Sequence, residues 1–171
     1  MSQSGPKHFS AGPGPTIYPT DAVAALLVLP GWRYMMQLRD DRPEIIYPGH
    51  WACFGGAVRP GETPLDTLRR ELREELEFEI SSAKEFAKFE FDVSAAGRGR
   101  FFRMYFEVPV SPEHVGRFVQ HEGAGMRIFG AEELLHAPWV APHDAFAVWL
   151  HRAGERVAPA RRAGEPRVER R

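Results

Sequence analysis

The chain has 171 residues, of which 43% are hydrophobic and 26% are charged, and this length and composition predict one globular domain with a sizeable core. The formal net charge of -1 argues against a protein that holds duplex nucleic acid by charge alone. Cys53 is the only cysteine, which excludes an intramolecular disulfide. A buried thiol is favoured over a reactive one, because no neighbouring residue would lower the pKa of Cys53.

The two ends of the chain differ from its middle in composition. Residues 1–8 lack the apolar core of a signal peptide, and the longest apolar run, 22–30, is too short to cross a bilayer, so a cytoplasmic protein without membrane contact is expected. Glycines and prolines in residues 1–20 predict a flexible arm. The arginine-rich residues 153–171 predict a flexible basic tail, either solvated or in contact with RNA or anionic surfaces. The ordered domain is therefore expected over residues 21–152.

Within this domain, predicted strands alternate with predicted helices. The first expected strands are 23–29 and 32–38, joined by a Pro-Gly turn, and a polar loop then leads to a short strand at 51–54. A helix is expected over residues 63–76. The later expected elements are a hairpin of 85–93 and 100–110, a strand at 126–129, a helical turn at 131–135 and a closing helix at 143–152. This order indicates an α/β layered domain.

The helix expected at 63–76 carries a core face and an acidic face. Thr63 suits the N-cap, Pro64 the first helical position and Asp66 the acidic position of a capping box. The residues that share the apolar face are Leu65, Leu68, Leu72 and Leu76. The adjoining face carries three acids, Glu71, Glu74 and Glu75.

Three clustered carboxylates repel one another, at roughly 0.2–0.5 kcal/mol for each pair at helical spacing. Hard divalent cations would offset this repulsion, because Mg²⁺ prefers oxygen ligands and is held by a few carboxylates together with substrate phosphates. Arg69, Arg70 and Arg73 support a second interpretation, in which the helix simply exposes a solvated, salt-bridged face.

The spacing of residues around this helix favours the first interpretation. The pattern is Gly, five residues, Glu, seven residues, Arg-Glu, an apolar residue, any residue, Glu-Glu, any residue, Gly and an apolar residue. The matching positions are Gly56, Glu62, Arg70, Glu71, Leu72, Glu74, Glu75 and Phe78, with Glu77 where glycine is expected. The segment thereby resembles the signature of the Nudix hydrolase family, in particular its MutT-like members, and the resemblance extends over residues 20–150. It implies an α/β/α sandwich with a central mixed sheet.

The resemblance also implies a role for each signature residue. The ligands of a divalent cation, Mg²⁺ or Mn²⁺, would be Glu71, Glu74, Glu75 and the backbone carbonyl of Gly55. Glu62 and Arg70 would form a structural pair that braces the loop against the helix. Cations of this kind neutralise a diphosphate and lower the pKa of bound water, which then attacks phosphorus.

The general base is the least certain of these roles. Glu71 is the first candidate for removing the proton of the attacking water. Residues 121–129 resemble a loop that supplies a further acid in MutT-like members, so Glu122 is a candidate fourth ligand or base. The alternative for Glu122 is a loop carboxylate in solvent.

Two positions bear on the helix end and on specificity. Glu77 must either accept the left-handed conformation that glycine favours after a helix, or end the helix differently. His143 stands where an asparagine reads the base in members that remove oxidised guanine nucleotides, which weakens that assignment. Four aromatic residues could stack on a base or sugar, although aromatic residues more often belong to the core: Trp51, Phe54, Phe129 and Trp139.

The resemblance implies a pyrophosphohydrolase that acts on a nucleoside diphosphate linked to another group, with a nucleoside triphosphate or a nucleotide sugar favoured. Its partner would be this small molecule rather than nucleic acid, and a homodimer would match many relatives. The alternative is a non-catalytic Nudix-fold module that binds a nucleotide or RNA. The complete set of signature acids argues against the module, whereas Glu77 and the basic tail argue for it.

Overall fold

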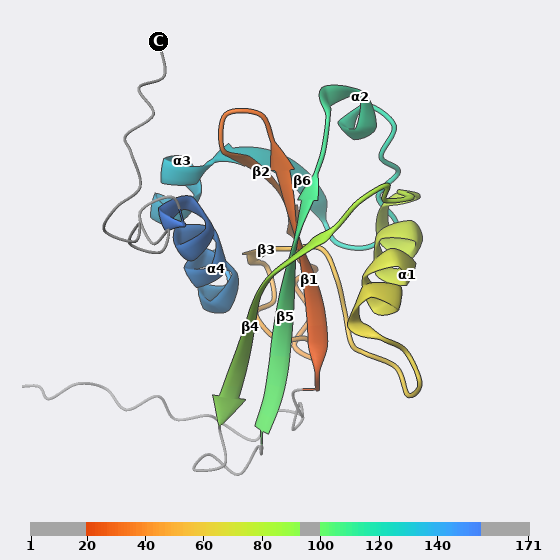
Figure 1. Cartoon of the computed structure of the whole chain (residues 1–171). Helices are drawn as coiled ribbons and strands as arrows, with labels where there is room; N and C mark the ends of the chain where they lie inside the picture. Colours follow the sequence, from red (N-terminus) through yellow and green to blue (C-terminus); the bar gives the residue numbers. More distant parts are fainter. Residues whose placement is uncertain (1–19, 93–99, 155–171) are drawn as a thin grey trace, which may run out of the picture.

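The structure, a computed structural model, describes residues 20–92 and 100–154 (Figure 1). Its elements in chain order are β1 (Ala22–Leu29), β2 (Arg33–Leu38), β3 (Trp51–Ala52), α1 (Pro64–Leu76), β4 (Lys84–Asp92), β5 (Arg100–Pro109), α2 (Pro112–Val115), β6 (Gly125–Gly130), α3 (Ala131–His136) and α4 (Pro142–Ala153). The order of strands and helices is the one that the sequence predicts, apart from α2, which the sequence pattern did not suggest.

The strands form one six-stranded mixed sheet in the order β3-β2-β1-β5-β4, with β6 also paired to β2. The pair β1–β5 is parallel, from Ala22 opposite Arg103 to Val28 opposite Pro109. The remaining pairs, β1–β2, β2–β3, β2–β6 and β4–β5, are antiparallel. The expectation of a central mixed sheet is confirmed.

Helices cover both faces of this sheet, with α1 on one side and α3 and α4 on the other (Figure 1). Val23, Ala25 and Leu27 of β1 pack in the same cluster as the leucines of α1, whereas Ala24 and Leu26 join the cluster of α3 and α4. Because both faces of β1 are buried, its sequence is apolar at every position. The resulting three layers are the α/β/α sandwich that the resemblance implies.

Strand β3 is shorter than the strand expected over residues 51–54. After Ala52 the chain leaves β2 and crosses to β1, where the nitrogen of Ala25 donates to the oxygen of Phe54 at 2.8 Å and the nitrogen of Val23 donates to the oxygen of Gly56 at 2.9 Å. This crossing places the Gly-Gly pair beside β1 and in front of α1.

The expected arm (1–20) and tail (153–171) lie outside the described residues, except for Thr20 and the end of α4 at residues 153–154. Among the residues that the structure describes, no helix has the length and apolar character needed to cross a membrane.

Candidate active site

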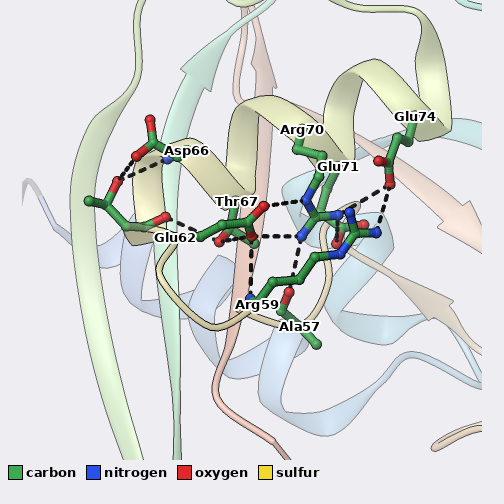
Figure 2. A network of polar contacts seen from close by, with 9 residues as sticks. Ala57, Arg59, Glu62, Asp66, Thr67, Arg70, Glu71 and Glu74 are labelled. Atoms are coloured by element: carbon green, nitrogen blue, oxygen red, sulfur yellow. Dashed lines mark hydrogen bonds and ion pairs between the residues drawn. The ribbon is translucent and has the colours of Figure 1, made fainter.

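The loop before α1 is fastened to the helix by an ion pair between Arg70 and Glu62. The Nε and Nη2 atoms of Arg70 donate to the two carboxylate oxygens of Glu62 at 2.7 and 2.9 Å (Figure 2). Thr67 also donates its hydroxyl hydrogen to Glu62, at 2.9 Å. The hydrogen bond from Arg70 is the main reason that the pKa of Glu62 falls to about 2, so this carboxylate stays charged. This is the structural pair that the resemblance implies.

Arg70 also holds two of the acids proposed as metal ligands. Its Nη1 donates to Glu71 at 2.6 Å and to Glu74 at 3.2 Å, and Arg59 adds a contact of 3.4 Å to Glu74 (Figure 2). Only 13% of the Arg70 side chain is exposed, and its hydrogen bond to Glu62 is the largest cause of a raised pKa. One permanently charged guanidinium therefore offsets part of the repulsion among the carboxylates.

Glu75 is the most buried of these acids, with 3% of its surface exposed. One of its oxygens accepts a hydrogen bond from the nitrogen of Gly55 at 2.9 Å. Burial raises the pKa of Glu75 to about 8. The hydrogen bond from Gly55 lowers this pKa, whereas the negative charges of Glu71 and Glu122 raise it further. Burial likewise raises the pKa of Glu71, in spite of Arg70. The site concentrates more negative charge than the protein itself compensates.

Gly55, directly before the motif, and Gly56, its first residue, leave space beside β1 and Glu71 that a side chain would fill. Gly55 has φ +130°, and a Cβ atom there would lie 2.4 Å from the carbonyl oxygen of Val23. A Cβ atom on Gly56 would lie 2.5 Å from the carboxyl group of Glu71. Any side chain at position 56 would thus displace a proposed metal ligand.

These acids open onto a cavity of about 1080 Å³. We call four of its carboxylates the acidic set: Glu71, Glu74, Glu75 and Glu122; Glu90 on β4 also lines the cavity. The cavity is also lined by Arg39 after β2, Arg103 on β5 and His143 on α4, with aromatic side chains that include Tyr47, Phe89, Phe91, Phe101 and Phe146. A strongly acidic group of residues and a basic, aromatic one therefore share a single space, which suits an elongated ligand with chemically different ends.

Arg103 is fixed by a buried acid that sequence reasoning missed. Asp144 is fully buried and accepts hydrogen bonds from the nitrogen of Cys53 at 2.9 Å and from the hydroxyl of Tyr105 at 2.7 Å, while Nε of Arg103 lies 3.3 Å from it. Burial alone would raise the pKa of Asp144, but the Arg103 guanidinium, His143 and the two hydrogen bonds lower it below its usual value. Asp144 is thus a buried carboxylate that orients Arg103 at the cavity.

Arg39 is held less completely. Its Nε atom is buried and has no hydrogen-bond partner among the residues that the structure describes. Burial lowers the pKa of Arg39, and the neighbouring charge of Arg103 lowers it further. We call Arg39 and Arg103, the two arginines beside Asp144, the arginine set. An unpaired guanidinium at a cavity favours a ligand that brings oxygen acceptors.

The structure separates the aromatic candidates for substrate binding. Phe54 and Phe129 are 0% and 1% exposed and belong to the two core clusters, which is the alternative that the sequence favoured for them, so they do not bind substrate through the cavity. Trp51 packs edge-on against Phe129 with ring centres 4.9 Å apart, and Trp139 is 70% exposed; neither lines the cavity. His143 does line it, and burial lowers the pKa of its imidazole.

Two sequence signals could have pointed to the arginine set. Arg103 is the one charged residue in the run Phe101-Phe102-Arg103-Met104-Tyr105-Phe106, and Asp144 comes directly before the apolar run 145–150. Charged residues inside apolar elements are rarely buried unless paired. Cys53 is buried, as expected, and burial raises the pKa of its thiol.

The acidic set fits a divalent cation by its chemistry. Its donors are all oxygens, and Glu75 is a buried carboxylate crowded by Glu71 and Glu122. Over residues 20–92 and 100–154, no three potential ligands already converge on one point. Glu71 and Glu74 are turned towards Arg70, so binding a cation would require these two side chains to rotate.

Comparison with known proteins agrees with the fold and with the motif. The family model described as NUDIX domain matches residues 19–156. The chain belongs to the Nudix family. Among curated proteins, this Nudix chain is 46% identical over 54 residues to nucleoside triphosphatase NudI of Escherichia fergusonii and 50% identical over 44 residues to that of Enterobacter sp. (strain 638). The two matches cover 32% and 25% of this chain, and only 37% and 31% of the relatives.

Solved structures extend the likeness over most of the chain. The solution structure of the E. coli ORF135 protein has a TM-score of 0.65 and 28% identity, covering 82% of this chain and 93% of that one. DR0079 from Deinococcus radiodurans has a TM-score of 0.62 at 22% identity, over 82% and 87% of the two chains, and supports the fold alone.

Proposed function

We propose that this Nudix protein is a divalent-metal-dependent pyrophosphohydrolase that cleaves a phosphoanhydride in a nucleoside diphosphate linked to another group. The observation that carries the proposal is one cavity lined by both the acidic set and the arginine set. The name of the NudI relatives, nucleoside triphosphatase, supports a nucleoside triphosphate as the first substrate to test. A nucleotide sugar is the second.

In this proposal Glu71, Glu74, Glu75 and the carbonyl of Gly55 hold Mg²⁺ or Mn²⁺. A bound cation supplies charge neutralisation for the diphosphate and lowers the pKa of water. Arg70 offsets part of the charge of Glu71 and Glu74 through its Nη1 contacts until they turn to the cation, and Glu62 keeps Arg70 in place. Glu71 is the first candidate for accepting the proton of the attacking water, with Glu122 as the alternative.

The arginine set would contact the part of the substrate beyond the phosphates. Because the carboxylate of Asp144 is already occupied by Cys53, Tyr105 and Arg103, the guanidinium groups of Arg39 and Arg103 offer a ligand hydrogen-bond donors. Donors of this kind recognise carbonyl oxygens, and the aromatic rings of Tyr47 and Phe146 offer surfaces for a base or sugar. A nucleoside with oxygen acceptors on its base fits these residues.

The proposal is tested by phosphate and phosphomonoester release from a panel of nucleotides, nucleotide sugars and dinucleotides, with Mg²⁺, with Mn²⁺ and with chelator. We expect metal-dependent cleavage of at least one compound, and a fall in turnover of at least about 100-fold in Glu75→Gln, which removes charge at constant shape. Glu79→Gln is the matched control, because Glu79 is an exposed acid that pairs with Arg73 outside the cavity.

Unchanged turnover in both Glu74→Gln and Glu75→Gln would contradict the proposal. Tight binding of one compound without any cleavage would replace the hydrolase with a binding module that retains the signature acids.

A further inference from the structure

Glu77, the residue that departs from the motif, ends α1 in a strained conformation. It has φ 53° and ψ 32°, the left-handed region that favours glycine. Its nitrogen donates to the oxygen of Arg73 at 3.0 Å, and the nitrogen of Phe78 donates to the oxygen of Leu72 at 3.1 Å. The bond from Glu77 to Arg73 is that of the αL C-cap motif, in which glycine is the usual residue. The helix therefore ends as it would with glycine, and Glu77 bears the strain.

The side chain of Glu77 makes a contact that glycine could not make. Its Oε1 atom lies 2.8 Å from Nε2 of His121. Because a carboxylate accepts hydrogen bonds, Nε2 of His121 is the donor. Next to this contact, the backbone nitrogen of His121 donates to the oxygen of Glu75 at 2.9 Å, and that of Val119 donates to the oxygen of Leu76 at 3.2 Å. The segment between α2 and β6 is thus attached to the end of α1.

The far end of this segment is attached to β2. The nitrogen of Ala124 donates to the oxygen of Leu38 at 2.8 Å, and a Cβ atom on Gly123 would lie 2.6 Å from the same oxygen. Within the segment, the side-chain amide of Gln120 donates to the backbone oxygens of Glu122 and Gly125 at 2.7 and 2.9 Å. Glu122 lies between the two attachments and faces the cavity with Glu71 and Glu75.

We propose that Glu77 is a positioning residue: through His121 it holds residues 119–125 against α1 and so keeps Glu122 at the cavity beside Glu71 and Glu75. The inference rests on the proposed function. It explains why a strained glutamate occupies a position that suits glycine. The side chain of Glu77 contacts His121, which is the neighbour of the cavity carboxylate Glu122. Strain of this kind persists where the surrounding structure makes use of it.

The test compares two substitutions that differ in reach. Asn at position 77 tolerates the left-handed conformation, but its side chain is one methylene too short to keep the contact with His121. Gln keeps both the length and the acceptor oxygen. We expect Glu77→Asn to lower kcat about two- to five-fold, the size of effect typical of an exposed pair, and Glu77→Gln to restore it. Glu79→Asn, at the exposed Arg73–Glu79 pair on the same helix end, is the control and should keep wild-type kcat.

Three further readouts distinguish positioning from a loss of stability. Glu77→Asn should not lower the melting temperature, because it relieves strain. It should speed amide hydrogen exchange in residues 119–125, with or without substrate. In a Glu122→Gln background it should have no further effect on kcat, since the contact acts through Glu122.

The proposal is overturned if Glu77→Asn leaves amide exchange and kcat unchanged, or if it slows a Glu122→Gln enzyme as much as the wild type. Should the wild-type protein hydrolyse nothing, the proposed function fails. The amide-exchange comparison still decides whether Glu77 holds the segment.

Discussion

The acidic set and the arginine set line the same cavity, yet they are built from the chain in different ways. Apart from Glu122, the contacts that hold the acidic set join residues close in sequence, such as Gly55 to Glu75, 20 positions apart, and Arg70 to Glu62, 8 positions apart. The contacts that hold Asp144 reach Tyr105, 39 positions away, and Cys53, 91 positions away. One set thus depends mainly on one loop and helix, whereas the other exists only when β3, β5 and α4 have come together.

The largest expected effect follows from this difference. Asp144→Ala removes the buried partner of three groups: the Arg103 guanidinium, the Tyr105 hydroxyl and the Cys53 nitrogen. The variant should lower the free energy of unfolding by about 3 kcal/mol or more, because these groups stay buried without an acceptor. Urea denaturation measures it. Asp40→Ala, at a surface pair of 3.7 Å with Arg42, is the control and should change stability by less than about 1 kcal/mol.

The loss of stability in Asp144→Ala should also depend on pH, in a direction that the pKa of Asp144 determines. The pKa of Asp144 is lowered in the folded protein, so its stabilising contribution is complete above the unfolded value of about 3.9 and is lost as pH falls through the folded pKa. The difference in stability between wild type and Asp144→Ala should therefore narrow below about pH 4. A difference that widens on acidification would mean that Asp144 is protonated in the folded state.

A smaller effect is expected at Arg39, with opposite signs for stability and binding. Because Nε of Arg39 is buried without a partner in the described chain, Arg39→Met should leave the free energy of unfolding unchanged or raise it. If the guanidinium binds substrate, KM should rise about tenfold, equivalent to one charge-assisted hydrogen bond. Steady-state kinetics on the preferred compound measure this change, and an unaltered KM would remove Arg39 from the substrate site.

The smallest effect concerns the start of α1, the helix that carries three members of the acidic set. Thr63 caps α1 by accepting a hydrogen bond from the nitrogen of Asp66 at 3.2 Å, so Thr63→Ala should lower the free energy of unfolding by about 1 kcal/mol. Thr63→Ser keeps the hydroxyl and should retain most of that stability. Equal losses in the two variants would indicate that packing of the threonine methyl group, rather than the cap, is responsible.

The features that could be predicted from the sequence are those that depend on residues close together in the chain. The start of α1 at Pro64, its leucine face and the pairing of Glu62 with Arg70 all depend on short spacings, and the structure has each of them. An α/β layered domain was equally accessible, because apolar strands and an amphipathic helix indicate which faces are buried, whereas the mixed sheet and the α/β/α sandwich were implied by the resemblance to the Nudix family. The roles of the acidic set in catalysis and metal binding remain predictions.

What the sequence left open was decided by tertiary contacts. An aromatic residue beside a motif can line a cavity or fill the core, and Phe54 fills the core because the chain crosses from β2 to β1 at that point. His143 was singled out at the start of α4, while its neighbour Asp144 is the residue that fixes Arg103. The place of Phe54 has no local signature. Asp144 has one, a charge directly before the apolar run 145–150, but its partners Cys53 and Tyr105 lie far away in the chain.

The burial of Cys53 has a practical consequence for studying this protein. The only thiol of the chain is 1% exposed and burial raises its pKa, so reagents that require a thiolate should not react with it in the folded protein. A cysteine introduced at Val119, which is 44% exposed, would then be the sole target for a fluorescent label. Such a label would report, in real time and on an otherwise native chain, how the segment that carries Glu122 moves as ligands arrive.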